Sequence, residues 1–304
     1  MLRPFRPDDA SAIHFLHAEH AAADLVDARA TIEPPLDPDG ARDRMATAEW
    51  AVVALDAAGS VVGWGSLRSW TEDDGTRVYL AGGYVAPPAR RRGLGGRLLR
   101  ESEAVAARLA ADRAEDGAVV LGGNASTVQD DRAALLERGG YRHVFSLVEM
   151  EHHGSPVRAR PLPDGVTVRA AVVADARPLH ALTARVWAGR QFFELPTEEQ
   201  LRDWLRRSEL ALFKVATVGD RLVGFVAVRR GPEIEDVQVD PGFQRRGLAT
   251  ALITQTLAGL AEREAGPVRL HTEGHDPAGA RSLYERLGFQ VVREYRRYRR
   301  PLSG

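Results

Sequence analysis

An internal duplication constrains the fold of this chain more than any other feature of its sequence. Residues 84–95 (YVAPPARRRGLG) match residues 238–249 (QVDPGFQRRGLA) in pattern, and the match sets Gly93 against Gly247. Because the repeat is as long as a domain, it predicts two homologous domains in tandem rather than a solenoid. Three further landmarks keep the same order in both halves: Arg3 and Asp9 against Arg169 and Asp175, residues 61–64 against 222–225, and residues 135–141 against 283–289.

The boundary between the two halves is expected in a stretch rich in proline and glycine that separates two strand-like segments. We therefore expect an N-terminal domain at residues 1–151, a linker at 152–165 and a C-terminal domain at 166–304. A chain of 304 residues is long enough for two domains of roughly 150 residues each. Its 44% hydrophobic and 27% charged residues are typical of globular proteins.

Each half is predicted to run strand, two helices, three strands, helix, strand, helix, strand, which is a mixed α/β arrangement. In the second half Asp175 begins a helix on which Leu179, Leu182 and Val186 recur at helical spacing. Gly219 and Asp220 form a hairpin-turn signal. The other elements expected there are helices around 201–205, 248–260 and 277–287, and strands at 212–217, 222–228, 233–239, 268–272 and 290–295.

Composition excludes several functional classes. The chain has no cysteine, so disulfides, thiolate metal sites and cysteine nucleophiles are excluded, and no metal is expected. The 41 basic and 42 acidic residues give a net charge of −1, which disfavours a protein that binds nucleic acid through its overall charge. No apolar stretch approaches a membrane span and the N-terminus lacks a signal core, so we expect a cytoplasmic protein without membrane partners.

The duplicated loop is suited to an anion, because it lies between a predicted strand and a predicted helix. Small residues let the backbone approach a ligand closely. The free N–H groups and the dipole of the helix N-terminus attract negative charge, and the neighbouring arginines add contacts to phosphate. The glycine spacing is neither that of a Walker loop nor that of the dinucleotide fingerprint. Each loop is a predicted pyrophosphate site, and the alternative is a tight turn with solvated arginines.

The second half resembles the GNAT superfamily of acyl-CoA-dependent N-acetyltransferases. The resemblance rests on Val-x-Val-Asp-Pro at 237–241, Gln-x-x-Gly-x-Ala at 244–249 and Leu-Tyr-Glu-x-Leu-Gly-Phe at 283–289, and it extends more weakly over the first half. It implies two GNAT-like domains, each a mostly antiparallel mixed sheet flanked by helices. It also implies acetyl-CoA as the cosubstrate and a primary amine as the acceptor, in a small molecule or at a peptide N-terminus.

The resemblance assigns a set of cofactor-binding residues. The backbones of Val237 and Val239 would bond the pantetheine arm, and the amides of the loop would hold the pyrophosphate. The residues implied in the second half are Val237, Val239, Gln244, Arg245, Arg246, Gly247, Leu248, Ala249 and Thr250. The corresponding residues in the first half are Val85, Arg90, Arg91, Arg92, Gly93, Gly95 and Gly96.

The chemistry needs a base and an acid. An amine is mostly protonated at neutral pH, so attack on a thioester requires a proton acceptor. Glu233 and Glu235 alternate along one strand and should share a face, so Glu235 or Glu233 is the predicted base. Asp236 points the other way unless a bulge re-aims it. Tyr284 matches the family tyrosine that protonates the departing thiolate; the alternatives are a solvated Glu235 and a Tyr284 ring that only packs.

The two halves are unequal at these positions. Leu136 corresponds to Tyr284 and Ala81 to Glu235, and neither replacement can exchange a proton. We therefore assign catalysis to the second half. The first half could bind acetyl-CoA without turnover, regulate, or only complete the fold. The second half departs from the family at Pro277, where an asparagine is usual.

Three other readings of the sequence stay open. The protein could be a non-catalytic acetyl-CoA-binding or regulatory module, or it could associate with nucleic acid through Arg90–Arg92 and the arginine-rich residues 293–300. It could be a monomer, with the halves packed as a pseudo-dimer, or a homodimer. The aromatic residues of the region expected to form the acceptor pocket are Trp187, Phe192, Phe193 and Trp204.

Overall fold

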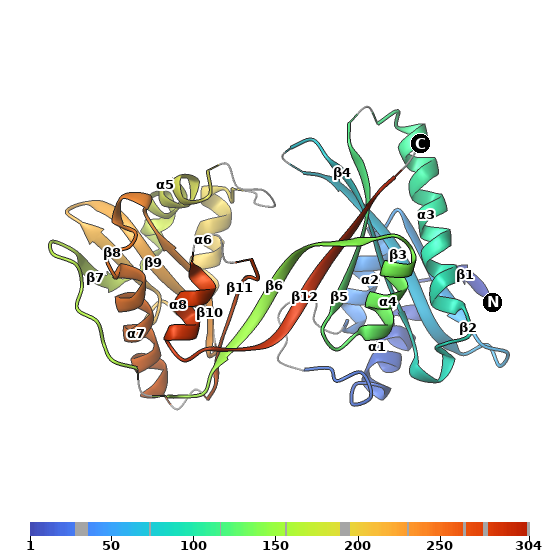
Figure 1. Cartoon of the computed structure of the whole chain (residues 1–304), viewed down its shortest axis with the longest axis horizontal. Coiled ribbons are helices and arrows are strands. Elements are labelled where there is room, and N and C mark those ends of the chain that lie inside the picture. Colours follow the sequence, from blue (N-terminus) through green and yellow to red (C-terminus); the bar gives the residue numbers. More distant parts are fainter. Residues whose placement is uncertain are drawn as a thin grey trace. The chain divides into compact units, whose positions relative to one another are not determined.

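The structure is a computed structural model that forms two compact units (Figure 1). The first unit contains residues 1–146 together with 295–304, and the second contains residues 147–294. Each is a sheet covered by helices on both faces. The residues described are 1–27, 36–72, 74–115, 117–155, 157–188, 195–229, 231–263, 266–275 and 279–302.

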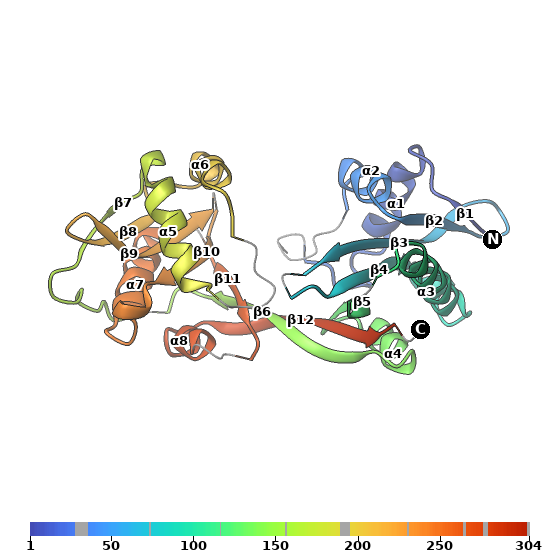
Figure 2. The same ribbon diagram turned by 90° about the horizontal axis from the view of Figure 1, so that it is seen from above.

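In the first unit the strands follow the order β1-β2-β3-β4-β5-β12. Strands β4 and β5 are parallel, and the other neighbouring pairs in this order are antiparallel. Helices α1 and α2 cover one face and α3 and α4 the other (Figure 2). The strands are β1 (Leu2–Pro4), β2 (Trp50–Leu55), β3 (Val61–Thr71), β4 (Arg77–Val85), β5 (Val119–Ser126) and β12 (Gln290–Pro301). The helices are α1 (Asp9–Glu19), α2 (Pro38–Ala46), the short 3-10 turn η1 (Pro87–Ala89), α3 (Leu94–Asp112) and α4 (Asp130–Arg138).

The second unit repeats this plan with the order β6-β11-β10-β9-β8-β7, in which β10 and β11 are parallel. Helices α5 and α6 cover one face, and α7 and α8 cover the other. The strands are β6 (Arg142–His152), β7 (Thr167–Ala170), β8 (Lys214–Val218), β9 (Arg221–Arg229), β10 (Glu233–Val239) and β11 (Val268–Glu273). The helices are η2 (Val173–Asp175), α5 (Ala176–Val186), α6 (Glu198–Arg207), η3 (Pro241–Phe243), α7 (Leu248–Ala261) and α8 (Ala280–Arg286).

The predicted mixed α/β fold in two tandem units is confirmed, but the last strand of each half belongs to the other unit. Residues 147–152 of β6 pair with β11, and residues 295–301 of β12 pair with β5. The boundaries expected from sequence had put residues 147–151 in the first domain, residue 152 in the linker and residues 295–301 in the second domain. Similarity between the halves reveals their common ancestry, whereas the choice of sheet edge depends on non-local pairing that local pattern does not encode.

The duplication extends to matching side-chain contacts. Arg3 donates to both carboxylate oxygens of Asp9 at 2.7 and 2.6 Å, and Arg169 donates to both oxygens of Asp175 at 2.7 Å. The hydrogen bonds from Arg3 hold the pKa of Asp9 below its ordinary value. Burial opposes ionisation of Asp175, but the hydrogen bonds from Arg169 and the Val172 backbone outweigh it and lower that pKa too. The first pair joins β1 to α1, and the second joins β7 to the start of α5.

Within the part of the chain that the structure describes, no helix is long and apolar enough to span a bilayer.

Candidate functional site

The two Arg/Gly loops have the same backbone geometry. Each follows its strand through a 3-10 turn and then enters the left-handed region twice. Arg91 and Gly93 have φ of 60° and 82° in the first unit, and Arg245 and Gly247 have φ of 62° and 88° in the second. A residue with a Cβ pays about 1–2 kcal/mol in this conformation, which explains the glycine at the start of each helix.

The helix after each loop begins with free backbone donors. Gly93 and Gly247 are the N-caps of α3 and α7, and neither offers a side chain to cap them. The first helical hydrogen bonds run from Arg97 to Gly93 and from Ala251 to Gly247, each at 3.0 Å. The three amides between each pair therefore have no partner within the helix. Free amides and the positive end of a helix dipole suit an anion, so the local geometry of each loop is compatible with the predicted pyrophosphate site.

Asp240 anchors the loop of the second unit, and the sequence analysis assigned it no role. Its buried carboxylate accepts hydrogen bonds from Gly242 N–H at 3.0 Å, Arg185 Nε at 3.0 Å and Arg221 Nη2 at 2.7 Å. Burial opposes ionisation, but these bonds keep the pKa of Asp240 below its ordinary value. The loop is thereby tied to α5 and β9. Alanine (Ala86) occupies the corresponding position in the first unit. An aspartate present in only one of the two repeats was therefore the feature of the sequence that could have pointed to this role.

Arg160 is a second residue that sequence reasoning missed. It lies in the segment that joins β6 to β7 within the second unit. Its side chain lies against Gly247, where an added Cβ would come within 2.8 Å of its Cζ. A cation is therefore held at the N-terminus of α7 beside the free amides. Its distance from the loop in sequence hides this contact. Arg246 lies over the Phe243 ring, with its Cζ 5.1 Å from the ring centroid.

A β-bulge in β10 decides where its acidic side chains point. Ile234 pairs with Val228, but the next pair is Asp236 with Ala227, so Glu235 is the extra residue. Ile234 and Val228 belong to the core under α7 and α8, whereas Ala227 belongs to the core under α5 and α6. Without the bulge Asp236 would share the face of Ile234. The bulge brings it to the α5/α6 side.

Asp236 lies just beyond the point where β10 and β11 stop pairing. The last parallel pair is Ile234 with Leu270, two residues before Asp236. Gln238 Nε2 donates to Asp236 Oδ2 at 2.7 Å. Burial raises the pKa of Asp236 to about 7, although the Gln238 amide and the Val237 N–H act in the opposite direction.

Tyr284 on α8 is 7% exposed, and its ring packs edge-on against Phe289 at 5.8 Å between centroids. Burial raises the pKa of its phenol well above the ordinary value, and the charge of Asp236 raises it further. The phenol is therefore a proton donor across the neutral range. The pair consists of a carboxyl group that titrates near neutrality and a phenol that stays protonated.

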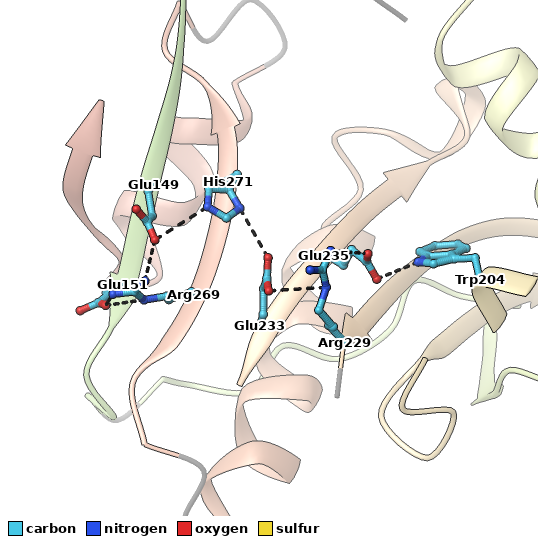
Figure 3. A network of polar contacts seen from close by, with 8 residues as sticks. All are labelled: Glu149, Glu151, Trp204, Arg229, Glu233, Glu235, Arg269 and His271. Atoms are coloured by element: carbon cyan, nitrogen blue, oxygen red, sulfur yellow. Dashed lines mark hydrogen bonds and ion pairs between the residues drawn. The ribbon is translucent and has the colours of Figure 1, made fainter. Parts of the chain in front are cut away.

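The two carboxylates predicted as the base are held by other side chains (Figure 3). Glu235 accepts hydrogen bonds from Trp204 Nε1 at 2.7 Å and Arg229 Nη2 at 2.8 Å. Glu233 lies 3.6 Å from Arg229 Nε and 3.6 Å from His271 Nδ1. Because Arg229 and other side chains already engage both of these carboxylates, the arrangement favours Asp236 as the proton acceptor. Trp204 therefore has a polar role in addition to packing.

The network continues into a buried cluster on β11 and β6. Arg269 donates to Glu149 Oε1 at 2.8 Å and to Glu151 Oε1 at 2.6 Å, and all three residues are at most 5% exposed. His271 Nε2 lies 3.8 Å from Glu149 Oε1, so the histidine joins this cluster to Glu233. The arginine compensates two carboxylates that would otherwise be buried charges. We assign this cluster to the stability of the β6–β11 pair.

The first unit lacks the corresponding chemistry. Strand β4 pairs with β3 without a bulge, from Gly63 with Val85 to Thr71 with Arg77. Leu136 packs against Gly123, where an added Cβ would come within 3.0 Å of its Cδ1. The unit keeps the loop geometry without an acid or a base at the matching positions.

Some predicted residues cannot be placed. Phe192, Phe193 and Pro277 lie outside the described residues. Trp187 follows α5 as its C-cap. Among the residues that are described, no group of three or more histidine or acidic side chains could hold a metal ion.

Sequence comparison matches both halves to one family. A family profile described as "Acetyltransferase (GNAT) domain" matches residues 174–301, and one described as "Acetyltransferase (GNAT) family" matches residues 22–125. The chain is 33% identical over 270 residues to a mycothiol acetyltransferase of Geodermatophilus obscurus, which covers 83% of this chain and 80% of the relative. A mycothiol acetyltransferase of Beutenbergia cavernae is 31% identical over 269 residues, which covers 82% and 83%.

Solved structures share the fold over the full length. A GCN5-related N-acetyltransferase from Sphaerobacter thermophilus has a TM-score of 0.74 at 22% identity and covers 100% of this chain and 96% of that chain. A tandem GNAT protein from the clavulanic acid biosynthesis pathway has a TM-score of 0.67 at 17% identity and covers 100% and 99%.

Proposed function

The chain belongs to the GNAT acetyltransferase family, and on that premise we propose that its second unit transfers acetyl from acetyl-CoA to the primary amine of a small molecule. The observation that carries this proposal is the bulge of β10, which sets Asp236 just beyond the last β10–β11 pair, on the strand that leads into the Arg/Gly loop. The charge of this carboxyl also acts on the buried phenol of Tyr284. Aminolysis of a thioester requires an unprotonated base to accept a proton from the amine and a protonated acid to donate one to the leaving sulfur.

Asp236 is the proposed base, in place of Glu235 or Glu233. As the amine nitrogen bonds to the carbonyl carbon of the thioester, Asp236 accepts a proton from that nitrogen, directly or through a water molecule. The carbon–sulfur bond then breaks and the sulfur takes a proton from the Tyr284 hydroxyl. Transfer of the proton from the Asp236 carboxyl to the Tyr284 phenolate, through water, would return both groups to their starting states.

The loop of the second unit is the proposed donor site. The free amides of Leu248, Ala249 and Thr250 would hold the pyrophosphate, and Arg160 and Arg245 would supply positive charge. The backbone of Val237 and Val239 would bond the pantetheine arm beyond the point where β10 leaves β11. Gln244, Arg246 and Gly247 complete the site predicted from sequence.

The acceptor is proposed from the relatives. Both are named mycothiol acetyltransferase and match about four fifths of the chain, so the amine precursor of mycothiol is the first acceptor to test. It would approach on the α5/α6 side, toward which the bulge turns Asp236. This side also carries the Trp204–Glu235 hydrogen bond.

The test is thiol release from acetyl-CoA with this precursor and a panel of other primary amines. Asp236→Asn and Tyr284→Phe should each lower kcat by roughly 100-fold or more, with little change in the KM for acetyl-CoA. Arg138→Ala, an exposed change on α4 of the first unit, is the control for handling and folding. Saturable acetyl-CoA binding with no turnover on any amine would instead favour a binding module. Full activity of Asp236→Asn would remove it as the base.

A further inference from the structure

In the first unit, the side chain of Arg132 fills the place where β4 and β5 stop pairing. Their last parallel pair is Ala81 with Gly123. Beyond it Arg132, on α4, donates from Nη1 to Gly83 O at 2.6 Å, from Nη2 to Ala81 O at 3.3 Å, and from Nε to Asn124 O. One guanidinium group thus donates hydrogen bonds to carbonyl groups of both strands.

A second arginine donates a hydrogen bond to a carbonyl group further along β4. Arg90 Nε donates to Val85 O at 2.8 Å, and its Nη2 donates to Asp24 Oδ1 at 2.6 Å. The Tyr84 hydroxyl donates to the same carboxylate. The carbonyls of residues 81, 83 and 85 alternate along β4 and so lie on one edge of it. All three accept hydrogen bonds from arginine side chains of the same unit.

The second unit differs at the position that corresponds to Arg132. Beyond the bulge, residues 237 and 239 correspond to 83 and 85, and they are the two valines proposed to bond the pantetheine arm. Ala280 corresponds to Arg132, and its methyl group has no donor and cannot reach the strand. Gln244 corresponds to Arg90 and donates to Val239 O at 3.2 Å, so that contact is common to both units. Arg132 is what distinguishes the two.

We propose that Arg132 closes the first unit to acyl-CoA by occupying the strand edge that the pantetheine arm needs, so that the chain binds one acetyl-CoA, in the second unit. This rests on the proposed function only in taking acetyl-CoA as the donor. A ligand entering the first unit would have to displace three charge-assisted hydrogen bonds without replacing the donor charge. Its affinity should be roughly 100-fold or more below that of the second unit. The intact anion-binding loop of the first unit is therefore insufficient for binding.

The experiment is a calorimetric titration of the full chain with acetyl-CoA that reads stoichiometry. The wild type should bind one equivalent. Gly247→Glu should bind none, because it places a carboxylate among the amides of the second loop. Gly75→Glu is its matched control, since Gly75 has φ of 85° against 88° at Gly247 and lies in a surface turn with nothing within 4 Å of an added Cβ. Two sites in the wild type, or one site retained by Gly247→Glu, would overturn the proposal.

A gain-of-binding variant tests Arg132 itself. Arg132→Ala installs the residue found in the second unit, and Gly247→Glu with Arg132→Ala should regain one site. Arg138→Ala, on the same helix, should regain none. If the double variant keeps its wild-type melting transition and still binds nothing, Arg132 is not what closes the unit. If the wild type binds no acetyl-CoA, the proposed donor site in the second unit is wrong. In that case a site gained by Arg132→Ala would still support the closure of the first unit by Arg132. If Arg132→Ala gained no site either, the closure would be refuted.

Discussion

Replacing Asp236 by asparagine should make the protein more stable and less active. The substitution keeps the shape of the side chain and removes its charge. Burial raises the pKa of this carboxyl from 3.8 to about 7, so the fold binds the proton more tightly than the unfolded chain does. Each tenfold change in proton affinity is worth about 1.4 kcal/mol, which sets an upper limit of about 4 kcal/mol on the destabilisation by the ionised group. This value is an upper limit because Asp236 is only partly buried, and contact with solvent reduces the penalty for its charge.

The sign of the effect depends on pH. The ionised carboxyl destabilises the fold fully above about pH 7. The penalty fades as the pH falls through 7 and vanishes below 3.8, where the folded and unfolded states both hold the proton. Asp236→Asn should therefore exceed the wild type in free energy of unfolding by up to about 4 kcal/mol at pH 8, and by progressively less at pH 6 and pH 5. Gln238 Oε1 is buried and has no hydrogen-bond partner among the described residues, so it is available to accept from the new amide.

The assay is urea unfolding of both proteins at pH 5, 6 and 8, together with kcat at pH 8. We expect the stability gain to grow with pH while kcat falls by roughly 100- to 10,000-fold. A variant that is less stable than the wild type at pH 8 would refute the claim that folding buries an unfavourable charge here. A pH-independent gain would refute the pKa argument, since an asparagine that merely packs better stabilises equally at every pH.

Three more predictions follow from the contacts of the second unit. Tyr284→Phe should lower kcat by roughly 100-fold while thermal unfolding changes little, because the ring contacts persist. Gln238→Met should raise the pKa on the acid side of the kcat profile above that of the wild type, because the amide hydrogen bond favours the ionised form of Asp236; an unmoved profile would count against that contact. Arg269→Met should cost about 3–5 kcal/mol in urea unfolding at pH 7, since it leaves two glutamates buried without a counter-charge; a loss below 1 kcal/mol would contradict it.

Local chemistry explains why the duplicated loops could be read from sequence. Gly93 and Gly247 stand where the backbone must be left-handed, and a strand before and an amphipathic helix after them have their own periodic signals. The Arg3–Asp9 and Arg169–Asp175 pairs are six residues apart, so they too are short-range features. Tyr284 was identified by its motif on one short helix, α8.

Contacts between residues far apart in the chain explain which features of the site could not be predicted from the sequence. The bulge at Glu235 arises from the register between β10 and β9, and it alone turns Asp236 to the face where an amine would approach. Arg160 reaches Gly247 from far along the chain, and Arg132 reaches the carbonyls of β4 from α4. No local pattern marks these arginines among the many in the chain.

The sequence by itself therefore determined the tandem α/β architecture, the two Arg/Gly loops and the tyrosine of α8, since each depends on residues close together in the chain. The tertiary structure alone decided which strand completes each sheet, where the carboxylates of β10 point, and which carbonyls of β4 accept hydrogen bonds from Arg132. These outcomes depend on strand register and on side chains that meet only after folding, because a shift of one residue in pairing moves a side chain to the opposite face of a sheet.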